Sequence, residues 1–319
     1  MTETTEVTDL PEVTVTDTAI TSGAIVARSP WSLAFRRLWR DRVAMVSFAV
    51  VVLMALIAIF APLIEHLVGH PANEQYHRIG LTPDGLPMPP SSTFWFGTDD
   101  LGRDVLVRVA YGARVSLGVG VVATLIAVAV GVAVGLAAGY FSGVVDSLLA
   151  RLIDVVLSMP FLLMAIALVS VTGPSLTVTV LVISFFSWSS VARIVRGQVL
   201  SIKEREFIEA ARSMGASDLR IMVVEVLPNV MAPVIVYTTL LIPVVIVAQA
   251  TLSFLGLGIP PPTPDWGGMI SEAQAYYQTS WWFLLAPGAA LVITTVAFNL
   301  FGDGIRDAFD PGVDRLMRR

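Results

Sequence analysis

The chain has 319 residues, of which 55% are hydrophobic and only 14% are charged, and it contains no cysteine. Soluble domains carry about a quarter charged residues, so this composition excludes an ordinary soluble protein and indicates a chain that lies largely in a membrane. The absence of cysteine excludes disulfide bonds and cysteine-ligated metals, and the net charge of −5 says little because most of the surface must face lipid.

The N-terminal part divides into a polar tail and a first apolar span. Residues 1–29 are rich in threonine and acidic residues and lack the basic and apolar regions of a signal peptide. We expect a disordered cytoplasmic tail there. A basic segment follows, and residues 43–64 carry no charge over a length that can cross a bilayer as a helix. Residues 30–64 are therefore expected to form a basic segment and a first transmembrane helix.

Further charge-free windows predict five more spans. The predicted spans are 115–145, 147–172, 174–192, 229–254 and 281–301. The charge-free run behind the third and fourth begins at residue 155 and ends at 192, with a tight turn at Gly173-Pro174 between the two helices, the first of which is expected to start near Ser147. The fold class is thus an all-α polytopic membrane protein with six transmembrane helices. We expect an extracytoplasmic loop at 65–112, a core of five transmembrane helices at 113–305 and a cytoplasmic tail at 306–319.

The distribution of arginines predicts the orientation. Most of them precede the first span, lie between the fourth and fifth spans, or follow the sixth. Positively charged loops stay in the cytoplasm, so these three segments and both termini are expected there. The predicted location is the bacterial plasma (inner) membrane, with lipid around the helices.

The polar segment 194–228 lies on the predicted cytoplasmic side. Ser201 and Glu204 have the spacing of a capping box that starts a helix, and Gly215 is placed to end it with positive φ. A second short helix, capped by Ser217-Asp218, is expected to end before Pro228. On the first helix one face would carry Phe207, Ala210, Ala211 and Met214, and Glu209 could pair with Arg212.

Two interpretations of this segment remain open on physical grounds. It could be an amphipathic loop that lies at the membrane surface and joins two spans. It could instead be a docking element for a cytoplasmic partner, because its small residues let another backbone approach closely.

Residues Glu209-Ala210-Ala211, Gly215 and Leu227-Pro228 resemble the EAA loop of binding-protein-dependent ABC importer permeases. The resemblance implies that this loop seats in a groove of an ATPase subunit and transmits its closure to the membrane helices. Glu225 departs from the family pattern, which has an apolar residue two places before Leu-Pro.

A second motif narrows the family. Residues 96–104 (FGTDDLGRD) and 111–117 (YGARVSL) resemble the signature before the second span of the dipeptide and oligopeptide permeases of the C type. The run 31–62 resembles the extra first helix of that subfamily. Together these matches imply a MetI-like type I ABC importer permease fold with one extra N-terminal helix.

The same resemblance implies a set of partners and a substrate class. The partners would be a second permease of the B type, two ATP-binding subunits or one fused ATPase, and an extracytoplasmic substrate-binding protein. Dipeptides and oligopeptides are the expected substrates, although relatives serve nickel, glutathione or other small solutes. No nucleic acid is expected as a partner.

From the residues alone, the stretch 97–104 fits a loop in which an aspartate caps the next helix. This structural role is favoured over direct contact with substrate. The stretch lacks the ligand spacing of a calcium loop. In the later outer loop, residues 256–280, Trp281 and Trp282 fit an interfacial aromatic belt. For the same loop the family resemblance implies contact with the binding protein, with Asp265 and Trp266 as candidates.

Polar residues within the spans are candidates to line a pathway or to form hydrogen bonds between helices. They are Ser184, Ser187, Ser190, Gln249 and Ser253. Arg151 and Asp154, three residues apart, are expected to pair near the interface. His66 and His70 have the i,i+4 spacing of a helical metal pair, but no complete ligand set accompanies them and no metal is expected.

The sequence also bears on the source of energy. The sole lysine, Lys203, lies outside any Gly-rich phosphate loop, so no Walker A motif is present. Buried carboxylates or paired broken helices typical of secondary carriers are not evident. We therefore expect a non-catalytic permease without cofactors, driven by ATP hydrolysis on another chain. The alternatives are a secondary carrier or channel, and a membrane-embedded assembly factor without transport.

Overall fold

The computed structural model describes residues 30–309, and the predicted tails at 1–29 and beyond 309 lie outside this range. The described chain is helical without any named strand. Five helices are long and apolar enough to cross a membrane, and a sixth candidate span consists of two helices that meet at 85°. The predicted all-α class and the six spans are therefore confirmed, with one span broken.

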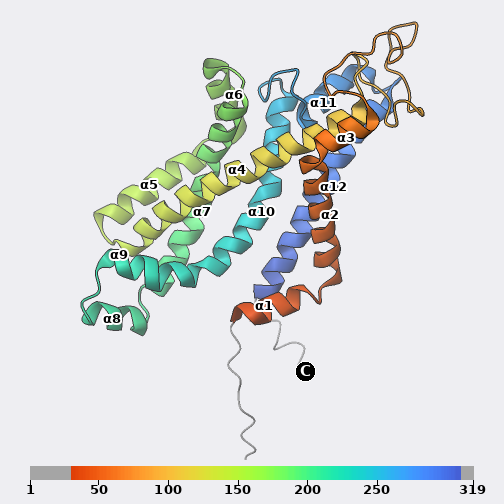
Figure 1. The fold of residues 1–319 in the computed structure, drawn as a ribbon. Coiled ribbons are helices and arrows are strands. Elements are labelled where there is room, and N and C mark those ends of the chain that lie inside the picture. Colours follow the sequence, from red (N-terminus) through yellow and green to blue (C-terminus); the bar gives the residue numbers. More distant parts are fainter. Residues whose placement is uncertain (1–29, 310–319) are drawn as a thin grey trace, which may run out of the picture.

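The N-terminal part packs on the side of the bundle. Helix α1 (Pro30–Leu38) lies across the foot of α2 (Arg42–Ile59), and α3 (Ala61–Val68) continues α2 upward (Figure 1). Asp41 caps α2 by accepting hydrogen bonds from Val43 N and Ala44 N. Helix α2 packs against α4 and α12, so the extra N-terminal helix is part of the bundle.

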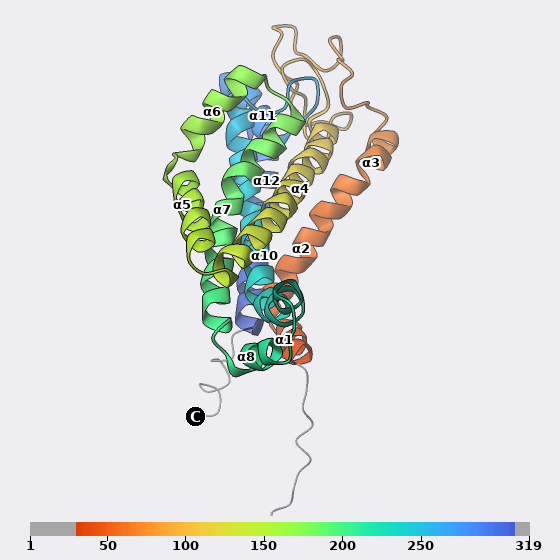
Figure 2. The ribbon, with the colours of Figure 1, turned by 90° about the vertical axis from the view of Figure 1, so that its left-hand side faces the viewer.

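Helix α4 (Val105–Tyr140) is the longest element and runs through the middle of the molecule (Figures 1 and 2). Asp104 caps it by accepting hydrogen bonds from Leu106 N and Val107 N, which confirms the predicted aspartate cap. The helix begins at Val105 and not near residue 115, because arginines in its first turns are neutralised by partners described below. The predicted loop 65–112 is correspondingly too long at its end.

Helices α4 and α7 (Leu176–Ile202) pack closely along a stripe of glycines. Gly131, Gly135 and Gly139 are each one turn apart on α4, and they face Val191, Val195 and Val199 of α7. A methyl group on any of the three glycines would lie 2.5–2.7 Å from a valine Cβ. Small residues let two membrane helices approach to main-chain contact, so this pair forms a tightly packed unit.

The third predicted span is not one straight helix. Helix α5 (Val144–Ser158) and α6 (Phe161–Thr172) meet at 85° around Met159-Pro160. Pro160 cannot donate a backbone hydrogen bond and its ring clashes with the preceding turn, so it ends α5. The prediction of a single helix over residues 147–172 is therefore wrong.

The polar segment after α7 forms a helical hairpin of α8 (Glu206–Ser213) and α9 (Asp218–Arg220). Gly215, with φ of +82°, makes the turn as predicted. The predicted capping box is wrong, because α7 continues through Ser201 to Ile202 and α8 begins at Glu206 without a side-chain cap.

The second helix of the hairpin does not end before Pro228. It continues through a π-helical segment (Ile221–Val226) into α10 (Leu227–Phe254). The wider π turn accommodates Pro228, which lies in the first turn of α10, where a missing N–H costs little. After α10, the short helix α11 (Trp266–Ala273) and a 3₁₀ turn (Gln274–Tyr276) lead to α12 (Trp281–Phe309).

The bundle has two distinct ends, which we call the hairpin end and the loop end. The hairpin end carries α8, α9 and α1, together with both ends of the described chain, Pro30 and Phe309 (Figure 1). The loop end carries α3, α6, α11 and the long loop of residues 69–104 (Figures 1 and 2). Both views place the two ends at opposite poles of the helices.

Candidate functional site: the hairpin, a lateral groove and a buried charge network

The helical hairpin, residues 206–220, is held to the bundle by a narrow face. Ile208 is fully buried and Ala211 is 6% exposed, and both belong to the main apolar cluster of the chain. Phe207, Ala210 and Met214 point away, so the predicted apolar face of α8 is shifted by one residue. Met214 is 82% exposed and Leu219 68%, so the hairpin presents apolar side chains that this chain does not cover.

The six residues of the predicted coupling motif lie on or next to this hairpin. Glu209 and Ala210 are exposed on α8, Ala211 anchors it, and Gly215 forms its turn. Leu227 and Pro228 mark the junction of the π-helical segment with α10. Gly215 has open space around it, because a Cβ there would meet no atom within 4 Å. The first atom of a larger side chain at position 215 would therefore point into open space.

The predicted pairing of Glu209 with Arg212 is replaced by a different contact. The guanidinium of Arg212 lies 5.9 Å from the centre of the Tyr140 ring. The Tyr140 hydroxyl donates a hydrogen bond of 2.7 Å to Asp218 at the start of α9. Interaction with Tyr140 raises the pKa of Arg212, and Arg212 stays positively charged in either case. These contacts place the last turn of α4 directly against the hairpin.

The charge pairs at this end also differ from those predicted. Asp154 pairs with Arg193 of α7 at 2.8 Å and not with Arg151. Arg196 of α7 makes a bidentate pair with Asp146, at 2.6 and 3.0 Å. Both ion pairs join α5 to α7. The predicted pair of Arg151 with Asp154 does not form, because Asp154 pairs with an arginine of the neighbouring helix.

A lateral groove lies between α5, α6, α7 and α10. It has a volume of about 500 Å³, and its walls are mostly apolar. Ser187 and Ser190 supply polar groups to its lining, beside Tyr237, Phe161 and Met159. These two serines therefore remain candidates to line a pathway.

The other predicted pathway residues are engaged inside the chain. The Ser184 hydroxyl donates to Ala123 O of α4 at 3.1 Å and to Val180 O at 2.7 Å. Gln249 is fully buried and donates to Ser253 Oγ and to Asp265, each at 3.0 Å. For Ser184, Gln249 and Ser253 the structure thus favours the alternative role of hydrogen bonds within and between elements.

Asp265 and Trp266 are buried, at 2% and 0% exposure. Asp265 caps α11 by accepting from Gly268 N, and burial raises the pKa of its carboxyl group. The Trp266 indole donates to Val109 O of α4 at 3.1 Å. Both side chains are buried inside the chain and fix α11 against α4 and α10. Contact of this region with a binding protein stays a prediction.

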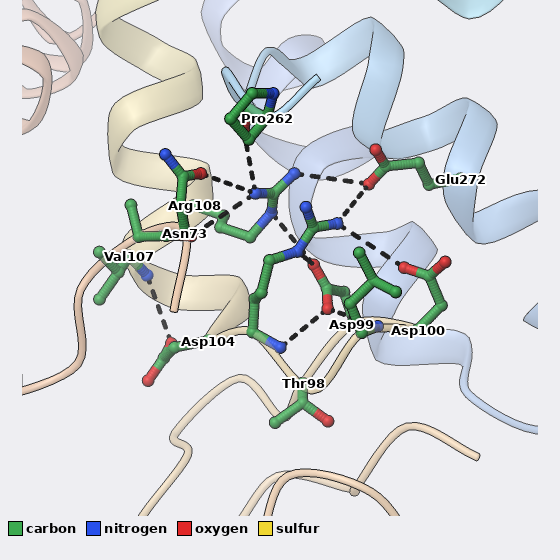
Figure 3. A network of polar contacts seen from close by, with 12 residues as sticks. Asn73, Thr98, Asp99, Asp100, Asp104, Val107, Arg108, Pro262 and Glu272 are labelled. Carbon is green, nitrogen blue, oxygen red and sulfur yellow. Dashed lines mark hydrogen bonds and ion pairs between the residues drawn. The ribbon is translucent and has the colours of Figure 1, made fainter. Parts of the chain in front are cut away.

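A buried charge network ties the long loop to α4 and α11 (Figure 3). Asp99, at 0% exposure, accepts from Arg103 Nε at 2.5 Å and lies 3.1 Å from Arg108 Nε. Both arginines reach Glu272 of α11, at 3.2 and 3.5 Å. Asp100 lies 3.7 Å from Arg103. The network therefore joins the predicted FGTDDLGRD motif to a helix far along the chain.

The network holds more negative than positive groups. Three carboxylates face two guanidiniums, and burial raises the pKa of Asp100 and of Glu272. Asp99, Asp100 and Glu272 lie close enough to hold a cation, but the two arginines already supply positive charge there. The sequence analysis missed Arg103, Arg108 and Glu272, although arginines beside a carboxylate-rich motif were an available signal.

The two histidines at positions 66 and 70 do not lie on one helix. Helix α3 ends at Val68, and Gly69 with φ of +78° turns the chain before His70. His70 Nδ1 lies 2.8 Å from Asp104 Oδ2, and the ring stacks on Phe94. His66 stays exposed on α3. The i,i+4 arrangement on one helix therefore does not exist.

Two models of known protein families match this chain. The family model described as "Binding-protein-dependent transport system inner membrane component" matches residues 131–315. The N-terminal transmembrane domain of oligopeptide transport permease C matches residues 29–77. This chain belongs to the family of binding-protein-dependent transport system inner membrane components, as the sequence motifs predicted.

Relatives with known names are similar along nearly the whole chain. The dipeptide transport system permease protein DppC of Alkalihalophilus pseudofirmus is 40% identical, covering 89% of this chain and 91% of the relative. The oligopeptide transport system permease protein OppC of Escherichia coli K12 is 45% identical, covering 90% and 93%. The glutathione transport system permease protein GsiD of Shigella flexneri is 43% identical, covering 90% and 92%.

A solved structure supports the predicted fold. A chain of the MetNI methionine ABC transporter in inward-facing conformations superposes with a TM-score of 0.53. It is 18% identical and covers 64% of this chain and 96% of its own length. The predicted MetI-like permease fold and the assignment as a non-catalytic, multi-pass membrane subunit are thus confirmed.

Proposed function

We propose that this chain is one of two permease subunits of an ATP-driven importer of dipeptides and oligopeptides. Permeases named for dipeptide and oligopeptide transport share 40–45% identity with it over about 90% of its length. A relative named for glutathione transport is nearly as similar. Glutathione, nickel or another small solute is therefore the second candidate cargo of the same importer class.

The hairpin is the surface that we assign to the energy-supplying subunit. Its apolar side chains, above all Met214 and Leu219, stand free of this chain at the end of the bundle. Exposed apolar clusters on such projections mark sites for partner proteins. We assign this surface to an ATP-binding subunit, with a second ATP-binding subunit or a fused one on the partner permease. The substrate would arrive from an extracytoplasmic binding protein at the loop end.

The proposed orientation places the hairpin end, and with it both termini, in the cytoplasm of a bacterial cell. The arginines of α1, the hairpin and the end of α12 gather at this end, as the positive-inside rule requires. Since the chain has no cysteine, Met214→Cys and Asp84→Cys each create a single labelling site. A membrane-impermeant maleimide should label Asp84→Cys in intact spheroplasts. It should label Met214→Cys only in inverted vesicles, prepared without the ATP-binding subunits that would cover position 214. The opposite pattern would reverse the topology.

The docking role is tested by Gly215→Arg in the complete importer. The space around Gly215 is open, since a Cβ there would meet no atom within 4 Å, so we expect normal membrane insertion but loss of ATP-dependent peptide uptake. Gly69→Arg is the matched control: Gly69 has φ of +78° and also meets no atom within 4 Å, but it lies at the other end. The two variants share the backbone strain and the added charge.

Each outcome of this comparison is informative. Loss of uptake in Gly215→Arg, with uptake retained in Gly69→Arg, supports docking at the hairpin. Normal uptake by Gly215→Arg refutes that docking role. If wild-type uptake ignores ATP depletion and no ATPase co-purifies with the chain, a secondary carrier replaces the importer proposal altogether.

A further inference from the structure

Helix α4 meets the hairpin although the two are not neighbours in sequence. The hairpin follows α7 and continues into α10, so the polypeptide itself links it to those two helices. Helix α4 has no such link. Its last residue, Tyr140, is 6% exposed and donates to Asp218 of α9 at 2.7 Å. Hydrogen bonds to a carboxylate are stronger than those between neutral groups.

The Tyr140 ring makes a second contact with the same hairpin. Arg212 of α8 places its guanidinium 5.9 Å from the ring centre, within the range of cation–π attraction. Tyr140 therefore touches both helices of the hairpin, through its hydroxyl on α9 and its ring on α8. A shift of either helix changes at least one of these contacts.

Helix α4 is suited to carry such a shift across the membrane. It has 36 residues without a proline, which corresponds to about 54 Å of helix. In the half of α4 that ends at Tyr140, the glycine stripe packs the helix tightly against α7. At its other end Arg108 reaches Glu272 of α11 at 3.5 Å. One straight element thus connects the hairpin with the charge network at the loop end.

We propose that Tyr140 is a positioning residue that couples the hairpin to α4, so that ATP-driven movement of the hairpin reaches the loop end through this helix. The inference rests on the proposed importer function. Tyr140 contacts neither substrate nor nucleotide in this scheme. Its hydroxyl holds the hairpin and α4 in one relative position, and Asp218 needs only an acceptor oxygen for that purpose.

The test uses the complete importer in liposomes, with its binding protein and ATPase subunits and a radiolabelled alanine tripeptide as the probe. The measured quantity is the number of ATP molecules hydrolysed per peptide imported. Tyr140→Phe keeps the ring under Arg212 and removes the hydroxyl. We expect this ratio to rise ~3–10-fold, the range that corresponds to losing one ordinary hydrogen bond, because Asp218 is exposed and water can solvate its carboxylate once the hydroxyl is gone.

Changes at Asp218 separate this role from general stabilisation. Asp218→Ala should raise the ratio as Tyr140→Phe does, and the double variant should be no worse than either single one, since all three lack the same bond. Asp218→Asn keeps an acceptor oxygen and should stay near the wild-type ratio. Tyr277→Phe removes another tyrosine hydroxyl contact, to Gln278 at 2.8 Å on the exposed surface, and should leave the ratio unchanged.

Several results would overturn the inference. They are a wild-type ratio in Tyr140→Phe, a proportional fall of uptake and ATP hydrolysis together, additive effects in the double variant, and loss of coupling in Asp218→Asn. If the importer proposal itself is wrong, the wild-type protein will show no ATP-dependent uptake. That result is distinguishable from failure of the Tyr140 inference, which appears only when variants are compared with an active wild type.

Discussion

The glycine stripe of α4 gives a quantitative prediction. In Gly135→Ala the new Cβ would lie 2.7 Å from the carbonyl oxygen of Ala192 and 2.7 Å from Val195 Cβ. Carbon contacts normally begin near ~3.5 Å, and neither neighbour can rotate away, because one is main chain and the other is a Cβ atom. Overpacking of this kind costs about 1–3 kcal/mol, while alanine in a helix gains about 0.5–1 kcal/mol over glycine.

The difference of these two effects gives an expected destabilisation of Gly135→Ala of about 0–2.5 kcal/mol, centred near ~1 kcal/mol. At the centre of this range the melting temperature should fall by about 2–4 °C. Thermal unfolding of the purified permease in detergent, followed by size-exclusion chromatography of heated samples, measures it.

Gly118→Ala is the matched control. Gly118 lies on the same helix, and a Cβ there meets nothing within 4 Å. This variant should be as stable as the wild type or slightly more stable. Equal melting temperatures for Gly135→Ala and Gly118→Ala would refute the close approach of α4 and α7.

Two further predictions concern the loop end. Glu272→Gln leaves two carboxylates facing two guanidiniums. Burial raises the pKa of the Glu272 carboxyl group, so the protonated carboxyl stabilises the fold at acid pH. This stabilisation is lost as the pH rises above the ordinary pKa of a glutamate. The melting temperature of Glu272→Gln relative to wild type should therefore increase from pH 4 to pH 7, and a constant difference would contradict this. Asp104→Ala removes the cap of α4 and the partner of His70 and should cost about 1–2 kcal/mol in thermal unfolding. Asp104→Asn keeps the capping oxygen and should lose less, so equal losses would argue against the cap.

Much of the architecture follows from local sequence patterns. Charge-free windows predicted the approximate positions of the spans, and an aspartate before an apolar run predicted the cap of α4. Gly215 was identified as a turn residue because only glycine adopts positive φ readily. These features depend on a few neighbouring residues, so no knowledge of the remaining fold was needed.

The errors arose where distant residues decide the outcome. The start of α4 was placed too late because Arg108 counts as a charge in a sequence window. In the fold it pairs with Asp99 and with Glu272, which lies 164 residues away. Asp154 likewise has its partner on another helix. Tyr140 could be expected only as an interfacial aromatic residue, since its contact with Asp218 exists only when the hairpin is folded.

The break at Met159-Pro160 limits which side of the chain can face lipid. Helix α6 begins without any side-chain cap, so its first N–H groups lack partners within the helix. Met159 lies at the break, is 38% exposed and lines the lateral groove. Acyl chains offer no hydrogen bonds, and irregular backbone at membrane depth persists only against protein or water. The backbone at this break is therefore expected to lie against water or another subunit and not against acyl chains.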